Sequence, residues 1–120
     1  MPAMNIQSER RGKVMVVLAS GRIDFAGAEA FRTAITPHLD ECVNLGGALL
    51  LDLGGVDYIS SAGLRELLIA AKRVGGSKGR MMVCQLQPMV KEVVRISRFD
   101  LVLSITEGPD EALARLEAAV

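Results

Sequence analysis

The sequence predicts an α/β fold in which a small, mostly parallel sheet of about five strands is covered by four helices. Apolar runs and segments with apolar residues at spacings of three and four follow one another in the order strand, strand, helix, strand, helix, strand, helix, strand, helix. Such alternation is typical of a mostly parallel sheet. Right-handed crossovers place the helix starts near the carboxyl ends of the strands, and that rim is where open α/β sheets usually hold their sites.

Length and composition limit the possible classes of protein. The chain has 120 residues, enough for a proper core, and we expect a single domain over residues 1–120. Half of the residues are hydrophobic but only 3% are aromatic, so aliphatic side chains and methionine must fill the interior. Fourteen basic and fourteen acidic side chains cancel, which gives no electrostatic case for binding nucleic acid or an anionic membrane.

Targeting segments are not evident in the sequence. No apolar run approaches the length needed to span a bilayer. Residues 1–13 contain a charged pair, but no apolar core of the signal-peptide kind follows it. We therefore expect a cytoplasmic protein without a membrane partner.

The first third of the chain predicts two strands and a helix. Residues 4–9 are a candidate for a short edge strand, residues 10–13 make a turn, and residues 14–23 are apolar at most positions, which suits a central strand. A helix over residues 26–42 follows, and glycines end it at 44–47. Its inward stripe is Ala28, Phe31, Ile35, Leu39 and Cys42. Pro37 removes a backbone hydrogen bond, so we expect a kink or break near Thr36.

The middle of the chain predicts a buried strand that leads into a helix. Residues 48–53 form an apolar run, Gly54 and Gly55 predict a tight turn, and a second short apolar step follows at 56–59. The helix begins after Ser60 and Ser61, and Gly75 and Gly76 stop it. Its expected inward stripe is Leu64, Leu67, Leu68, Ala71 and Val74.

The last third predicts two more strand–helix pairs. Residues 80–86 read as a buried strand and residues 101–105 as a short one. Pro88 suits the first position of a short helix, whose inward residues are Met89, Val90, Val93, Val94 and Ser97. Pro109 opens a terminal helix with acidic residues at its favourable end and with Leu113, Leu116 and Val120 on its apolar face.

The serine pair lies at the place most suited to present chemistry. Ser60 and Ser61 stand where a buried strand feeds a helix N-terminus, which carries unpaired N–H groups and a partial positive charge. A phosphate on Ser61 would find a favourable field there and would add close to two negative charges. On spacing alone, the alternative is that Ser61 only caps the helix.

The segment DLGGVDYISSAGLRELL resembles the signature of the STAS family, and in particular its single-domain anti-sigma factor antagonists. Their pattern is a buried strand ending in Asp-Leu, an apolar pair, and then Asp-Ser-Ser/Thr-Gly-Leu opening a helix. The resemblance implies that Ser61 is phosphorylated by a partner kinase, with Ala62 and Gly63 beside it. Ser60 stands where the family has its aspartate. The resemblance covers essentially the whole chain and implies a small mixed sheet with four helices, the first strand being antiparallel.

A second fragment, GRIDFAGAEAFR, also resembles the family, whose second strand ends in Gly-x-Leu/Ile-Asp. The family's aspartate lies close to the phosphorylated serine, so Asp24 is a second candidate site residue by resemblance. On spacing alone, Asp24 is equally well explained as the cap of the following helix.

The resemblance also implies a function and its partners. The unmodified protein would bind an anti-sigma factor that is a serine kinase of the GHKL ATPase type, and so release a sigma factor. Phosphorylation of Ser61 would break that complex, and a PP2C-type phosphatase would restore it. Candidate partner-binding residues on the outer or flanking positions of the helix after Ser61 are Arg65, Ile69 and Lys72. Ile69 stands among charged residues, so it either contacts a partner or is half covered by a neighbouring loop.

Catalysis, metals and cofactors find no support in the sequence. Ser61 lacks the GxSxG turn of a hydrolase nucleophile, and no phosphate-binding loop of the GxxxxGK[ST] kind is present. Cys42 and Cys84 are far apart without companion ligands, which predicts buried thiols, and His38 has no obvious partner. We therefore expect a binding protein, not an enzyme, with no metal or cofactor.

Two alternative functions stay open. One is a structural STAS subunit of a lipid-transport or stress-signalling complex, in which Ser61 is never modified. The other is a sensor that holds a small ligand on the same rim, although the scarcity of aromatic residues argues against a nucleotide.

Overall fold

The computed structural model describes residues 4–76 and 79–119, and over these residues the fold is the predicted α/β arrangement. A five-stranded sheet has the order β1–β2–β3–β4–β5, with β1 antiparallel to β2 and all other neighbours parallel. The elements are β1 (Asn5–Arg11), β2 (Val14–Ile23), α1 (Phe25–Leu45), β3 (Ala48–Ile59), α2 (Ser61–Gly76), β4 (Arg80–Cys84), α3 (Pro88–Ile96), a 3₁₀ helix (Phe99–Leu101), β5 (Ile105–Thr106) and α4 (Pro109–Ala119).

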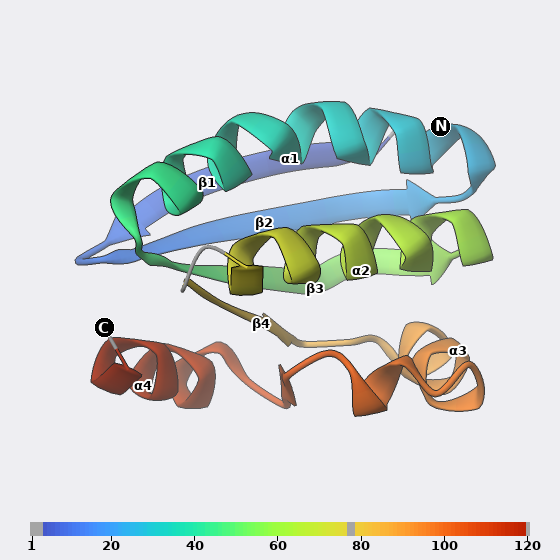
Figure 1. The fold of residues 1–120 in the computed structure, drawn as a ribbon. Helices are drawn as coiled ribbons and strands as arrows, with labels where there is room; N and C mark the ends of the chain where they lie inside the picture. Colours follow the sequence, from blue (N-terminus) through green and yellow to red (C-terminus); the bar gives the residue numbers. More distant parts are fainter. Residues whose placement is uncertain (1–3, 77–78, 120) are drawn as a thin grey trace.

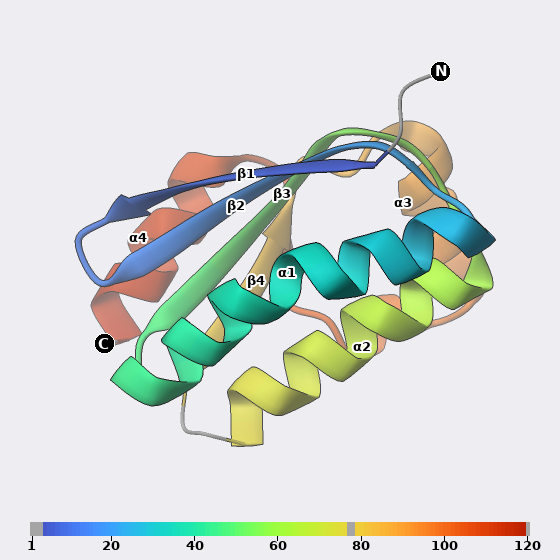
Figure 2. The same ribbon diagram turned by 90° about the horizontal axis from the view of Figure 1, so that it is seen from above.

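Helices cover both faces of the sheet (Figure 1). Helices α1 and α2 lie side by side over one face, as Figure 2 shows, and α4 lies over the other. The larger core lies under α1 and α2 and includes Phe31, Leu51 and Leu67, each fully buried. A smaller core lies under α4, around Leu50 and Leu116. Burial of these two apolar layers is the main force that holds the helices against the sheet.

The N-terminal hairpin confirms the two predicted strands, and β2 has the predicted bounds. The predicted turn over 10–13 is too wide, because β1 continues to Arg11, which pairs with Val14. Only Gly12 and Lys13 form the turn, and Gly12 has a φ of 62°, which a glycine adopts without strain.

Helix α1 runs without interruption through Pro37, so the prediction of a break is wrong. Pro37 is exposed, and the lost hydrogen bond therefore lies on the solvent side of the helix. The buried residues Phe31, Ile35 and Leu39 hold both halves of the helix on the sheet. The helix continues to Leu45, three residues past the predicted Cys42. It ends at a glycine as predicted, with Gly46 in the left-handed conformation at a φ of 63°.

Strand β3 is continuous through Gly54 and Gly55, so the predicted turn at this place is also wrong. Leu18 and Ser20 pair with Asp52 and Gly55, which leaves one extra residue in β3 between these pairs. Such a bulge bends a strand without ending it. A Cβ atom on Gly55 would lie 2.7 Å from the Cβ of Ser20, so the glycine permits the close approach of β2 and β3.

Helix α2 begins at Ser61, one residue before the predicted start, and it includes Gly75 and Gly76, the glycines predicted to stop it. Its buried face is turned slightly from the predicted one. Leu64, Leu67 and Val74 are buried as predicted, whereas Ala70 is fully buried in place of the partly buried Leu68 and Ala71. Gly63 is also buried. The helix therefore packs closely at its first turn, where its side chains are smallest.

The C-terminal third differs most from the prediction. Strand β4 ends at Cys84, two residues before the expected end, because Gln85 adopts a left-handed φ of 58°. In α3, Val90 and Val94 are buried as predicted, but Met89 is 57% exposed and is not an inward residue.

The predicted strand over 101–105 is wrong for most of its length. Residues Phe99–Leu101 form a 3₁₀ helix, and the strand β5 is limited to Ile105–Thr106. The backbone of Leu103 still donates to the carbonyl of Phe99, at 2.8 Å, so the chain remains coiled up to that point. Helix α4 buries Leu113 and Leu116 as predicted, and Val120 lies outside the described residues.

Gly63 is the residue on which the junction between β3 and α2 depends most closely. A Cβ atom there would lie 2.7 Å from Ile23 Cγ2 and 2.9 Å from the Ile23 carbonyl oxygen, which cannot move freely. We expect Gly63→Ala to lower the free energy of unfolding by about 1–3 kcal/mol, because the extra methyl overpacks the core. Urea denaturation measures the change.

The matched control is Gly75→Ala in the last turn of the same helix, where a Cβ atom would meet open space. Alanine favours a helix more than glycine, so this variant should gain up to about 1 kcal/mol. Equal losses in the two variants would contradict the packing assigned to Gly63.

Candidate functional site

The candidate site lies on the rim where β2 and β3 end and where α1 and α2 begin. The backbone N–H of Ser60 donates a hydrogen bond of 2.8 Å to the carbonyl of Ile23, the last residue of β2. This bond continues the pairing of Ile23 with Ile59 at the end of the two strands. The starts of the two helices are therefore held on one rim by adjacent strands, as the fold class predicts.

Ser60, and not Ser61, caps α2. Its Oγ accepts a hydrogen bond from the N–H of Gly63 at 3.2 Å, and its carbonyl accepts one from Leu64 at 2.9 Å. A serine with both bonds occupies the N-cap position. The alternative in which Ser61 serves only as the cap is therefore wrong.

Ser61 is the first residue of α2, and its side chain is exposed. Within the described part of the chain, its hydroxyl makes no hydrogen bond and is not needed to satisfy the helix end. The first turn of α2 also has no acidic residue, so the partial positive charge of this helix end is not offset there. The position is chemically suited to receive a negatively charged group.

Asp24 caps the neighbouring helix, which confirms the interpretation made on spacing alone. Its Oδ1 accepts a hydrogen bond of 2.8 Å from the N–H of Gly27 at the start of α1. Its Oδ2 lies 3.8 Å from Nε of Arg22, whose guanidinium stacks 4.4 Å from the centre of the Tyr58 ring. Asp24 directly follows Ile23, so it lies on the same rim as Ser60. Its proximity to Ser61 remains a prediction from the resemblance.

Ser61 opens onto a shallow surface hollow between α1 and α2, which we call the Ser61 hollow. The hollow is lined by Phe25, Arg32, Ser61, Ala62, Arg65, Glu66 and Ile69. Four of these residues, Ser61, Ala62, Arg65 and Ile69, are sequence-predicted site residues, and the structure brings them together. Lys72 is exposed further along α2 and does not line the hollow. Gly63 is buried against Ile23 and Ile59.

Phe25 is the residue of this site that sequence reasoning missed. It is 85% exposed, directly after the capping Asp24, and forms a wall of the hollow. Ile69 is 47% exposed and lines the same hollow from α2. The sequence gives no signal of this exposure, because Phe25 lies three residues before Ala28 and continues the inward stripe of α1 by its spacing. Two apolar side chains beside the serine make this surface suitable for protein contact.

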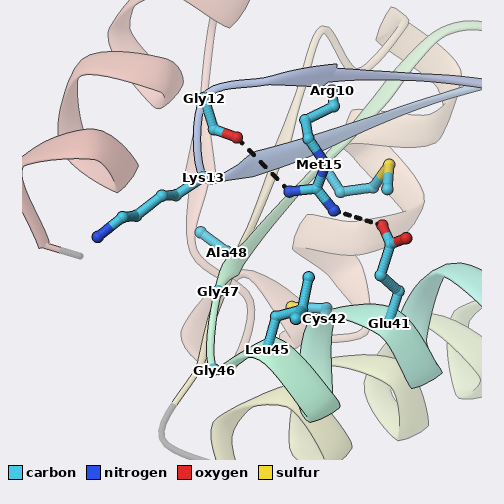
Figure 3. A pocket seen from close by; sticks show the side chains of 10 residues that line it. All are labelled: Arg10, Gly12, Lys13, Met15, Glu41, Cys42, Leu45, Gly46, Gly47 and Ala48. Carbon is cyan, nitrogen blue, oxygen red and sulfur yellow. Dashed lines mark hydrogen bonds and ion pairs between the residues drawn. The ribbon is translucent and has the colours of Figure 1, made fainter.

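A second pocket lies at the opposite end of the fold, below the β1–β2 turn (Figure 3). It is lined by residues of the hairpin, of the end of α1 and of the start of β3, and it has a volume of about 260 Å³. Arg10 crosses it to pair with Glu41 and reaches the carbonyl of Gly12 (Figure 3). Because Arg10 is already paired with Glu41 and none of the predicted site residues lines the pocket, it is not the candidate site.

Both cysteines are buried and free, as the sequence predicts. Burial raises the pKa of the Cys42 thiol, and burial together with the charge of Asp52 raises the pKa of Cys84 to about 12. Both thiols are therefore protonated near neutral pH, which makes them poor nucleophiles. Among the described residues, no group of three or more His, Cys, Asp or Glu side chains is arranged to hold a metal ion.

Residues 4–76 and 79–119 contain no helix whose length and apolarity would let it cross a membrane.

Comparisons with known proteins agree on one family. The model of the STAS domain matches residues 5–112. BtrV of Bordetella bronchiseptica, named as a candidate anti-sigma factor antagonist, is 30% identical over 117 residues, which are 98% of each chain. The crystal structure of an anti-sigma factor antagonist from Mycobacterium paratuberculosis has a TM-score of 0.84 and 25% identity, and the match covers 96% of this chain and 95% of that one.

The fold is also shared with a solved structure of lower sequence identity. SpoIIAA, an anti-sigma factor antagonist solved in its unphosphorylated form, has a TM-score of 0.75 and 19% identity, over 97% of this chain and 99% of that one. At this identity, the likeness shows the fold alone.

Because the two serines have different roles, we expect their replacement by alanine to lower the free energy of unfolding by different amounts. Ser60→Ala removes the cap of α2 and should lower the free energy of unfolding by about 1 kcal/mol. Ser61→Ala removes an exposed hydroxyl that has no hydrogen-bond partner in residues 4–76 and 79–119, and it should change the free energy of unfolding by less than about 0.5 kcal/mol. Urea denaturation of both variants makes the comparison, and a larger loss for Ser61→Ala would contradict the assignment of the cap.

Proposed function

Since the chain belongs to the STAS domain family and its similar relatives are named anti-sigma factor antagonists, we propose that it is an anti-sigma factor antagonist controlled by phosphorylation of Ser61. In the unmodified form it binds an anti-sigma factor, which then releases its sigma factor. The proposed binding partner is itself a serine kinase of the GHKL ATPase type. The protein acts by binding and needs no catalytic group of its own.

The observation that carries this proposal is the exposed Ser61 hydroxyl, which makes no hydrogen bond with the part of the chain that the structure describes. A kinase can reach it without unwinding α2, because Ser60 keeps the cap. The kinase transfers the γ-phosphoryl group of ATP to Ser61 Oγ, with release of ADP and of the hydroxyl proton. Hydrolysis of the phosphoserine by a PP2C-type phosphatase returns the serine and inorganic phosphate.

The surface of the Ser61 hollow explains how phosphorylation of Ser61 would weaken the binding of the partner. Phe25 and Ile69 supply apolar surface on two sides of the serine, and Arg65 adds a charged side chain. In the proposed complex this hollow is covered by the partner, together with Lys72 further along α2. A phosphate on Ser61 would place a dianion within that covered surface, and the cost of removing it from water opposes binding.

Ser60 in place of the family's aspartate is compatible with this mechanism. Serine and aspartate are both good N-cap residues, so the start of α2 is preserved. The serine also leaves no carboxylate directly before Ser61, and a new phosphate therefore meets less local repulsion.

The test begins with identification of the partner. Tagged Ser61→Ala protein is expressed in the native host, and proteins that copurify with it are identified by mass spectrometry. The purified partner is then titrated by calorimetry with the wild type, Ser61→Ala and Ser61→Asp. We expect Ser61→Ala to bind like the unmodified wild type and Ser61→Asp to bind at least about tenfold more weakly, a loss of ~1.4 kcal/mol.

The matched control is Ser8→Asp, which adds the same charge to an exposed serine on β1, away from the hollow. It should bind like the wild type. Equal affinities of Ser61→Asp and Ser61→Ala would contradict the proposed switch. A stable partner that is not a kinase would instead support the structural-subunit alternative.

A further inference from the structure

Arg65 is placed to reach a group attached to Ser61. The two residues are one helical turn apart on α2 and both line the Ser61 hollow. Side chains at this spacing lie on the same face of a helix, and their Cα–Cβ bonds tilt toward its N-terminus. An arginine side chain at position 65 can therefore reach back toward the turn of Ser61.

The guanidinium of Arg65 is available for a new partner. The side chain is exposed, and within residues 4–76 and 79–119 it takes part in no ion pair or hydrogen bond. By contrast, Arg73 on the same helix is already paired with Asp40 of α1.

A second arginine faces the hollow from α1. Arg32 lines it opposite α2, and its Nη2 lies 4.0 Å from Oε1 of Glu29, an exposed pair of little strength. Among the described residues that line the hollow, Glu66 alone carries a carboxylate. The charges of the lining thus sum to +1 before modification, which favours an anion.

We propose that the Ser61 hollow is the binding site for the phosphoryl group carried by Ser61 itself, with Arg65 as its main ligand and Arg32 as the second. The planar fork of a guanidinium matches two oxygens of a phosphate and makes strong charge-assisted hydrogen bonds with them. This phosphate site would explain how phosphorylation regulates the proposed function, and its biological role rests on that proposed function.

The consequence is that phosphorylation changes the docking surface in two ways. It adds a dianion to the surface. It also engages Arg65, which in the unmodified protein would be available to pair with a carboxylate of the partner. Neither change requires a movement of the backbone. The phosphate also lies at the start of α2, where it interacts favourably with the helix dipole, so the modified protein stays folded.

The experiment uses the full chain with phosphoserine inserted at position 61 during translation, and the second pKa of the phosphate is measured by ³¹P NMR titration. An adjacent cation stabilises the dianion and lowers this pKa from its usual value of about 6. We expect Arg65→Gln to raise it by at least about 0.5 unit relative to the phosphorylated wild type. Arg65→Lys keeps the charge and should stay close to the wild type.

The matched control is Lys72→Gln, which removes a charge from an exposed position of α2 outside the hollow. It should leave the phosphate pKa unchanged. An unchanged pKa in Arg65→Gln, or an equal rise in Lys72→Gln, would overturn the proposal.

Different results would contradict the proposed function and the proposed phosphate site. The phosphate is introduced during translation, so the titration result does not depend on any kinase. If no kinase modifies Ser61, the proposed function fails and the phosphate site still stands. If Arg65 does not affect the phosphate while Ser61→Asp still weakens partner binding, only the phosphate site fails.

Discussion

The hydrogen bond from the N–H of Ser60 to the carbonyl of Ile23 is the interaction on which the candidate site depends. It fixes the start of α2 at the end of β2, and Gly63 allows α2 to lie close against Ile23 and Ile59. Because α1 starts from the same strand end through Asp24, the first turns of both helices are held on one rim. The Ser61 hollow is the surface between them.

The structure assigns the two adjacent serines to different tasks. Ser60 is a structural residue whose hydroxyl oxygen accepts a hydrogen bond from the helix backbone. Ser61 is exposed, and its hydroxyl makes no hydrogen bond within the described residues. A regulated hydroxyl benefits from this separation, because a residue that caps a helix cannot be modified without disturbing the helix end. The chain as a whole is neutral, but the lining of the hollow is not, and its positive charge is local.

Much of the fold could be predicted because it follows from local apolar pattern. The bounds of β2 and the approximate bounds of α2 are set by runs and spacings visible in the sequence. The predictions failed where tertiary context overrides local preference. Gly54 and Gly55 suggest a turn, yet pairing with β2 carries the strand through them as a bulge. Likewise, Pro37 does not interrupt α1, because buried residues on both sides hold the helix in place.

The sequence predicted which residues belong to the candidate site better than it predicted how they are arranged. The resemblance located Ser61 and Asp24, and helical spacing placed Arg65 and Ile69 on one side of α2. Which serine caps α2 could not be read from an adjacent pair, since either hydroxyl is a good cap until the strand end is fixed. Phe25 was missed because its exposure depends on how α1 packs beside α2, which is not a property of the local sequence.

The most direct test of the central claim is the intact mass of the protein, with peptide mapping, after incubation with ATP and its copurified partner. We expect the addition of a single phosphoryl group on Ser61 and none on Ser60, with loss of the partner from the modified protein. A partner that remains bound with no phosphoryl group added, or a phosphoryl group on Ser60 with Ser61 unmodified, would contradict it.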